Sequence, residues 1–135
     1  MKKIALFVLS ALMLWVAVVA FAAPGKSKTG HSKVVHITMT NTLKFNPASD
    51  TIRVGQTVEW RNTSLLVHTV TCDPKKAAKP EHVALPEGAE PFDSGNMDPD
   101  ATFRHTFTVP GVYKYFCIPH EAAGMVGEIV VLPAK

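Results

Sequence analysis

Short runs of β-branched and aromatic residues, separated by turn-forming Gly, Pro, Asn and Asp, dominate the chain from Val34 onward. Such runs predict strands, and alternating apolar and polar positions predict strands with one buried face. We expect strands over residues 34–39, 51–54, 57–61, 67–72, 102–109, 112–117 and 127–132. No stretch has a sustained helical period, so the pattern predicts an all-β sandwich.

The N-terminal residues differ from this pattern. A basic head, Met1-Lys2-Lys3, precedes the apolar stretch 4–23, and Ala20-Phe21-Ala22 fits a signal-peptidase site. We therefore predict a signal peptide over 1–22, a lead-in over 23–33 and one domain over 34–135, exported to the periplasm or another extracytoplasmic space. The alternative is an uncleaved membrane anchor, because a helix of about 20 apolar residues spans a bilayer.

Charge adds little to this picture. Removing Lys2 and Lys3 with the leader reduces the 14 basic residues to 12, against 11 acidic ones. A protein that binds nucleic acid needs a concentrated basic stripe, and none is evident here.

The stretch 73–91 contains four prolines and no alternation of apolar and polar positions. We predict a long irregular loop with at most one helical turn. Its length makes it a candidate for function, but a solvated insertion is the interpretation that we favour.

The densest group of chemically capable side chains lies near the C-terminus. Cys117, His120 and Met125 fall within nine residues between two predicted strands, and Pro119 and Gly124 allow a tight loop. A thiolate, an imidazole and a thioether form a soft donor set that suits copper, and two His, one Cys and a distant Met make the electron-transfer geometry.

The second imidazole has to come from elsewhere in the chain. His68 is our candidate, because it follows a loop and begins a predicted strand, where sites are usually built. We therefore expect one copper ion held by His68, Cys117, His120 and Met125. A zinc site is less compatible, because zinc does not need the Met.

These residues carry a resemblance to a known family. The segment from Tyr115-Phe116-Cys117 through Pro119-His120 to Gly124-Met125-Val126-Gly127 resembles the copper loop of plastocyanins, among the cupredoxins. Upstream, Leu43-x-Phe45-x-Pro47 and Val58-x-Trp60-x-Asn62 also resemble that family. The resemblance implies a Greek-key β-sandwich of about seven to eight strands. The His-to-Met spacing fits plastocyanins and pseudoazurins, and the missing acidic patches favour a bacterial relative over the plant type.

Two positions depart from the family pattern. Family members often have Asn after the first His ligand and Ser or Thr after the Cys, and a hydrogen bond ties the two copper loops together. This chain has Thr69 and Ile118 there. The resemblance does not carry that hydrogen bond over.

The resemblance implies a function as well as a fold. It implies a small one-electron carrier, not an enzyme, that acts as a monomer and meets a cytochrome or membrane oxidoreductase only transiently. An exposed apolar surface around His120 would be the docking site; our candidates for it are Leu43, Leu65, Leu66, Pro119 and Ala122. The alternative function is a periplasmic copper carrier or chaperone that delivers copper.

The remaining Cys and His residues are assigned structural or surface positions. Cys72 is expected to be a buried free thiol, since a disulfide to Cys117 would remove the proposed thiolate ligand. We expect the other histidines to be surface residues: His31, His36, His82 and His105.

Overall fold

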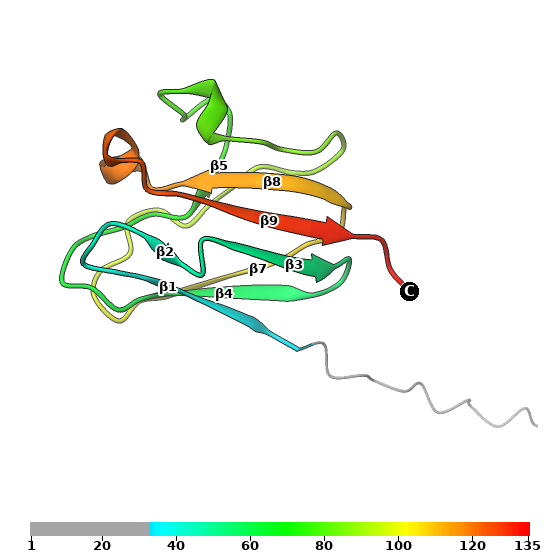
Figure 1. Cartoon of the computed structure of the whole chain (residues 1–135), viewed down its shortest axis with the longest axis horizontal. Coiled ribbons are helices and arrows are strands. Elements are labelled where there is room, and N and C mark those ends of the chain that lie inside the picture. The colour runs from blue at the N-terminus through cyan, green and yellow to red at the C-terminus, as the bar shows by residue number, and fades with distance from the viewer. Residues whose placement is uncertain (1–32) are drawn as a thin grey trace, which may run out of the picture.

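The structure, a computed structural model, describes residues 33–135, which form nine strands and two 3₁₀ helices (Figure 1). The predicted all-β sandwich is confirmed, with nine strands in this part of the chain instead of seven or eight. The predicted signal peptide and nearly all of the lead-in, including His31, lie outside the described residues. The elements are β1 (Val35–Met39), β2 (Phe45–Asn46), β3 (Ser49–Arg53), β4 (Thr57–Asn62), β5 (Thr71–Cys72), η1 (Pro80–His82), β6 (Phe92–Asp93), β7 (Thr102–Thr106), β8 (Gly111–Phe116), η2 (Ile118–Ala123) and β9 (Val126–Leu132).

Two sheets pack face to face. One has the strand order β2-β1-β4-β7 and the other β3-β9-β8-β5-β6. Strand β1 runs parallel to β4 and β3 runs parallel to β9, whereas the other pairs are antiparallel. Chain segments distant in sequence therefore meet in each sheet, and the loops at one end of the sandwich converge (Figure 1).

Alternation along the strands builds the core between the sheets. Ile37 and Met39 of β1, Trp60 of β4 and Ile129 of β9 are fully buried. Successive side chains of a strand point to opposite faces, so each of these strands buries every second residue. The predicted alternation of buried and exposed positions is confirmed in these strands.

Gly127 shows why the exit from the loop over 117–125 needs a glycine. It pairs with Tyr115 between β9 and β8, and a Cβ at this position would collide with the Tyr115 ring. Tyr115 itself is fully buried and packs edge-on against Trp60 and Phe45. A side chain at Gly127 would displace one of the largest residues of the core.

The prediction for His105 was wrong. His105 is half-buried, and its ring stacks on that of Phe92 with centroids 4.1 Å apart. Residues of equal parity share one face of a strand, so His105 lies on the same face as Phe103 and Phe107. Burial lowers the pKa of His105.

The strand predicted over 67–72 is mostly a loop. Only β5 is regular, and His68 forms an isolated bridge to Met97. The segment is nevertheless buried, since all residues from His68 to Cys72 are inaccessible or nearly so. No helix among residues 33–135 is long and apolar enough to cross a membrane.

The stretch 73–91 is the predicted irregular loop with one helical turn, η1. Cys72, just before it, is a buried free thiol as expected. Its Sγ lies 3.3 Å from the carbonyl oxygens of Ala84 and Lys114, and burial raises its pKa to about 12. Cys72 therefore stays protonated at neutral pH and packs the stretch against β8.

Candidate metal centre

Side chains from two loops at one end of the sandwich meet at a single point. His68 and Cys117 are fully buried, and His120 is partly exposed. Their ligand atoms all lie within 4.8 Å of one another. The fold thus brings together three residues that the sequence analysis selected, one of them 49 residues from Cys117 along the chain.

The distances between these donors fit a shared ion. Sγ of Cys117 lies 3.5 Å from Nδ1 of His68 and 3.4 Å from Nδ1 of His120. Metal bonds to His nitrogen and Cys sulfur are about 2.0–2.3 Å long, which separates two donors by about 3.5–3.8 Å at trigonal or tetrahedral angles. The donor set, with Met125 buried in the same loop, matches a type-1 copper site.

Hydrogen bonds decide which nitrogen of His68 faces the metal. Nε2 of His68 lies 2.8 Å from Oγ of Ser64, and that hydroxyl donates to Oδ1 of Asn62 at 2.8 Å. Because the Ser64 proton is used on Asn62, Ser64 accepts a proton from Nε2 of His68. Nδ1 of His68 is then unprotonated and free to bind a metal.

Burial supports the same protonation state. It lowers the pKa of His68, and the nearby His120 acts in the same direction. Neutral imidazole is the form that ligates metals. His68 is therefore prepared as a ligand before any ion arrives.

The Cys117 sulfur is held by the facing loop. The backbone N–H of Thr69 donates to Sγ of Cys117 at 3.3 Å. Burial raises the pKa of Cys117, while hydrogen bonds from Thr69 and from the backbone of His120 oppose that effect. Thiolate is the metal ligand, so a bound cation would displace the thiol proton.

The loop from Cys117 to Met125 is closed by its own backbone. The N–H of Cys117 donates to the carbonyl of Met125 at 3.1 Å, and the N–H of Met125 donates to the carbonyl of His120 at 3.2 Å. Gly124 ends η2 with φ +79°, a left-handed conformation that favours glycine. The predicted role of Gly124 in the tight loop is confirmed.

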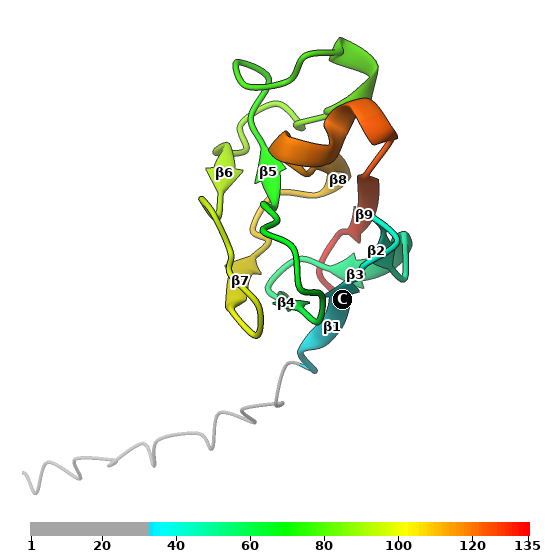
Figure 2. The same ribbon diagram turned by 90° about the vertical axis from the view of Figure 1, so that its left-hand side faces the viewer.

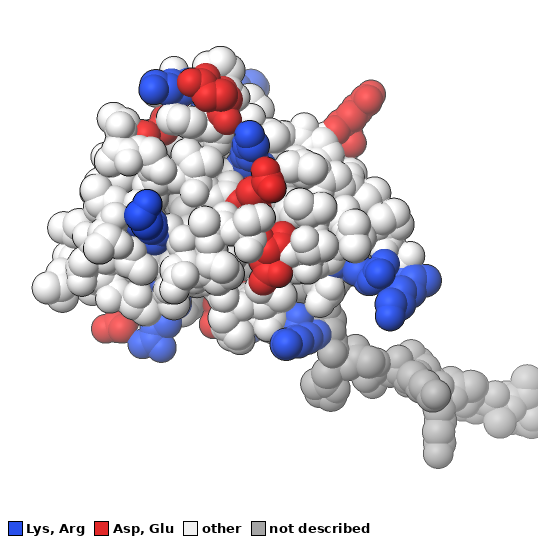
Figure 3. Space-filling view, in the orientation of Figure 1, with Lys and Arg blue, Asp and Glu red and all other residues white. Residues whose placement is uncertain are grey.

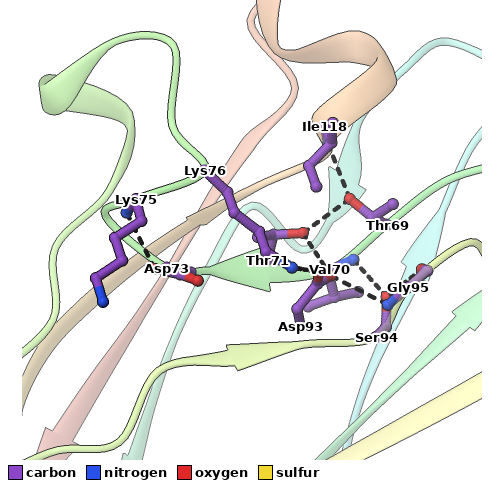
Figure 4. Close-up of polar contacts among 10 residues, drawn as sticks. All are labelled: Thr69, Val70, Thr71, Asp73, Lys75, Lys76, Asp93, Ser94, Gly95 and Ile118. Atoms are coloured by element: carbon purple, nitrogen blue, oxygen red, sulfur yellow. Dashed lines mark hydrogen bonds and ion pairs between the residues drawn. The ribbon is translucent and has the colours of Figure 1, made fainter.

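A hydrogen bond ties the two loops despite the departures at Thr69 and Ile118. Oγ1 of Thr69 accepts from the backbone N–H of Ile118 at 2.8 Å (Figure 4). The hydroxyl of Thr69 continues to that of Thr71 at 2.9 Å, and Thr71 donates to Oδ1 of Asp93 at 2.9 Å. Thr69 thus ties the loops, and because it accepts a backbone N–H, the side chain of Ile118 takes no part.

Glu121 and His82 add a contact that the sequence analysis missed. Glu121 is 6% exposed and accepts hydrogen bonds from the N–H groups of Ala78 and Lys79 at 2.9 and 3.0 Å. Nδ1 of His82 lies 3.1 Å from the same carboxylate, so His82 is not the plain surface residue we predicted. Burial alone would raise the pKa of Glu121, but these partners together lower it.

The candidate docking residues are mostly exposed. Leu65 is 84% exposed and Leu66 41%, with Pro119 and Ala122 also at the surface. Leu43 is instead half-buried against the core. On the face shown in Figure 3, the end of the molecule at the left carries few charged side chains.

Sequence reasoning missed the residues that orient the ligands. Asn62 belongs to a motif that resembles the family, but the sequence does not show that it orients a ligand, and Ser64 does not differ in sequence from a solvated loop residue. For Glu121 a signal existed: it is an acidic residue in an otherwise uncharged loop, directly after a proposed ligand.

Comparison with known proteins agrees with a copper site. Residues 32–132 match the family of copper binding proteins described as the plastocyanin/azurin family. The plastocyanin of Synechococcus sp. (strain JA-2-3B'a(2-13)) is 32% identical over 142 residues, covering 96% of this chain and 93% of the relative. The halocyanin of Natronomonas pharaonis is 34% identical over 107 residues, covering 77% of this chain and 59% of the relative.

Some relatives are longer, and solved structures agree on the fold. The chain spans 55% of the chloroplastic plastocyanin of Oryza sativa subsp. indica and 59% of that of Tetradesmus obliquus. A pseudoazurin from Sinorhizobium superposes with a TM-score of 0.58 at 30% identity, over 75% of this chain and 76% of the other. The amicyanin of Paracoccus versutus superposes with a TM-score of 0.57 at 28% identity, over 75% of this chain and 83% of the other. The chain therefore belongs to the plastocyanin/azurin family of copper-binding cupredoxins.

Proposed function

We propose that this protein is an exported one-electron carrier whose copper is held by His68, Cys117, His120 and Met125. When bound, copper would supply a Cu(II)/Cu(I) couple, with the Cys117 thiolate, the imidazoles of His68 and His120 and the Met125 thioether as its ligands. The observation that carries the proposal is the buried, prearranged donor set, with Cys117 Sγ 3.5 and 3.4 Å from the two imidazole nitrogens.

Electron transfer is fast when the ligands move little between oxidation states, and several contacts restrain them here. Ser64 holds the ring of His68, and the N–H of Thr69 holds the sulfur of Cys117. The backbone bonds between Cys117 and Met125 close the loop. These restraints are made by the protein itself, so they hold the ligands in both oxidation states.

The exposure of the proposed ligands suggests a path for the electron. Among the four proposed ligands His120 is the one that is partly exposed. Apolar side chains of Leu65, Leu66 and Ile118 are exposed at the same end of the sandwich. An apolar surface without strong charge suits brief docking, since redox partners form small interfaces and separate quickly.

Export, partner and oligomeric state are parts of the proposal that rest on the sequence. The leader over 1–22 supports a periplasmic or other extracytoplasmic location. The partner would be a cytochrome or a membrane oxidoreductase, met by a monomer.

The test is the spectrum of the copper-loaded protein. An intense thiolate-to-copper absorption band and a narrow copper hyperfine splitting are expected, and both should disappear in Cys117→Ser. The matched control is Cys72→Ser, which removes the other buried thiol and should keep both signals.

The competing function makes a different prediction. A weakly coloured protein with an ordinary tetragonal copper signal that survives Cys117→Ser would contradict the proposed ligands. It would favour a carrier that delivers copper instead of electrons.

A further inference from the structure

The stretch 73–91, which we call the clamp segment, supplies none of the four proposed ligands but lies against the loop that carries three of them. Figure 2 shows the helical turn η1 of this segment next to η2. Long irregular loops in compact domains are usually either functional or linker segments, and the contacts of this one favour a function.

The first attachment is the Glu121 carboxylate. Oε2 accepts from the N–H of Ala78 at 2.9 Å, and Oε1 accepts from the N–H of Lys79 at 3.0 Å. Nδ1 of His82 is 3.1 Å from Oε1. A nearly inaccessible carboxylate with three partners on one segment is fixed in position, because each lost partner would leave a buried polar group unpaired.

The second attachment is made on the side of the centre where Cys117 lies. Lys76 of the clamp segment forms an ion pair with Asp93, which accepts from Thr71 (Figure 4). Asp93 only accepts, so each hydroxyl in the chain donates toward it, and Thr69 is left to accept from the N–H of Ile118. Hydrogen bonds in such a series polarise one another, which strengthens the last of them, the bond from the N–H of Ile118 to Thr69 beside Cys117.

We propose that the clamp segment tunes the copper centre, with Glu121 as a positioning residue that restrains the backbone at His120 and places a fixed negative charge there. This inference rests on the proposed function. Restraint at His120 limits the movement of that ligand between oxidation states. The carboxylate favours the more positive oxidised centre, so it lowers the reduction potential.

The test compares Glu121→Gln with Glu81→Gln, which makes the same charge change on an exposed residue of η1. Both variants should keep the intense blue band. Glu121→Gln should have a higher reduction potential and a several-fold slower electron self-exchange rate, while Glu81→Gln should match the wild type. A folded Glu121→Gln that matches the wild type in both measurements would overturn the proposal.

A second readout needs no copper. In the metal-free protein, the amides of Ala78 and Lys79 should be protected from hydrogen exchange, and Glu121→Gln should reduce that protection several-fold. A wild type that shows no blue band would sink the proposed function, whereas unprotected amides would sink the clamp.

His82→Phe provides a variant that keeps the carboxylate. It removes one partner of Glu121 but preserves a ring at that position. We expect normal blue absorption with a slower self-exchange rate than the wild type. An unchanged self-exchange rate would contradict a role for the contact between His82 and Glu121.

Discussion

Ser64 illustrates how one hydroxyl sets the chemistry of a ligand. It accepts from Nε2 of His68 and donates to Asn62, whose amide in turn donates to the carbonyls of Leu66 and Met97. Asn62 is fully buried at the end of β4, so the network starts from a rigid strand. The tautomer of His68 is therefore determined by residues that touch no metal.

We predict that Ser64→Ala weakens copper binding by about 10–100-fold, the usual cost of losing a partner behind a ligating His. The physical reason is that Nε2 loses its acceptor and the ring of His68 loses its fixed orientation. Affinity would be measured by competition with a copper chelator. Ser49→Ala, on the exposed edge of β3, is the control, and equal affinities for the two variants would refute the role of Ser64.

At the scale of elements, β7 carries a titratable residue into an apolar cluster. The ring of His105 lies 4.1 Å from that of Phe92 and 4.7 Å from that of Phe107, measured between centroids. Burial disfavours its charged form and lowers its pKa in the folded protein. In the unfolded chain the same residue titrates near its ordinary value of about 6.5.

The sign of the pH effect follows from that difference. As pH falls below about 6.5, the unfolded chain takes up a proton that the folded protein does not yet bind, so the folded state loses stability. The loss ends once pH has passed below the lowered folded pKa. His105→Phe removes this contribution.

We therefore predict that acidification from neutral pH destabilises the wild type more than it destabilises His105→Phe. Denaturant unfolding of both proteins at neutral pH and at a pH below 6 would measure the difference. Both proteins share all proposed copper ligands, so effects of pH on those residues cancel. A difference in unfolding free energy that stays constant with pH would contradict the assignment.

Over the whole molecule, the exposed apolar side chains are distributed unevenly. Leu65, Leu66, Val67 and Ile118 are exposed around the loops of the centre. Val112, which is also exposed, is the second residue of β8 and lies at the opposite end of that strand from the copper loop. Two copies of the protein that exchange an electron would meet through their apolar ends.

We predict that Leu65→Glu slows electron self-exchange several-fold. Each copy then brings a carboxylate to the contact, and the two repel each other. Added salt should restore part of the rate, because ions screen exposed charges. Val112→Glu is the control, and an equal slowing in both variants would show that net charge alone is responsible.

The class of fold and the proposed ligand set could both be predicted from the sequence alone. Alternation fixes which side of a strand is buried, and this is a local property, so most strands were predicted within a few residues. The spacing of Cys117, His120 and Met125 is also local, because one loop carries all three. Only the pairing with His68 required an inference across the chain, which the family resemblance supported.

Tertiary structure decided what surrounds those ligands. The partners of Thr69 and Glu121 lie on distant segments, so their contacts could not be predicted from neighbouring residues. Ser64 pairs with residues close to it in sequence, but its role depends on the conformation of that loop. The tie between the loops survives the departures at both positions. The hydroxyl of Thr69 accepts the bond, and Ile118 donates through its backbone N–H, which every residue except proline has. Burial of His105 and His82 likewise depends on which segments pack against them. A strand's alternation and a loop's spacing are set by neighbours in the chain, whereas hydrogen-bond partners are set by neighbours in space.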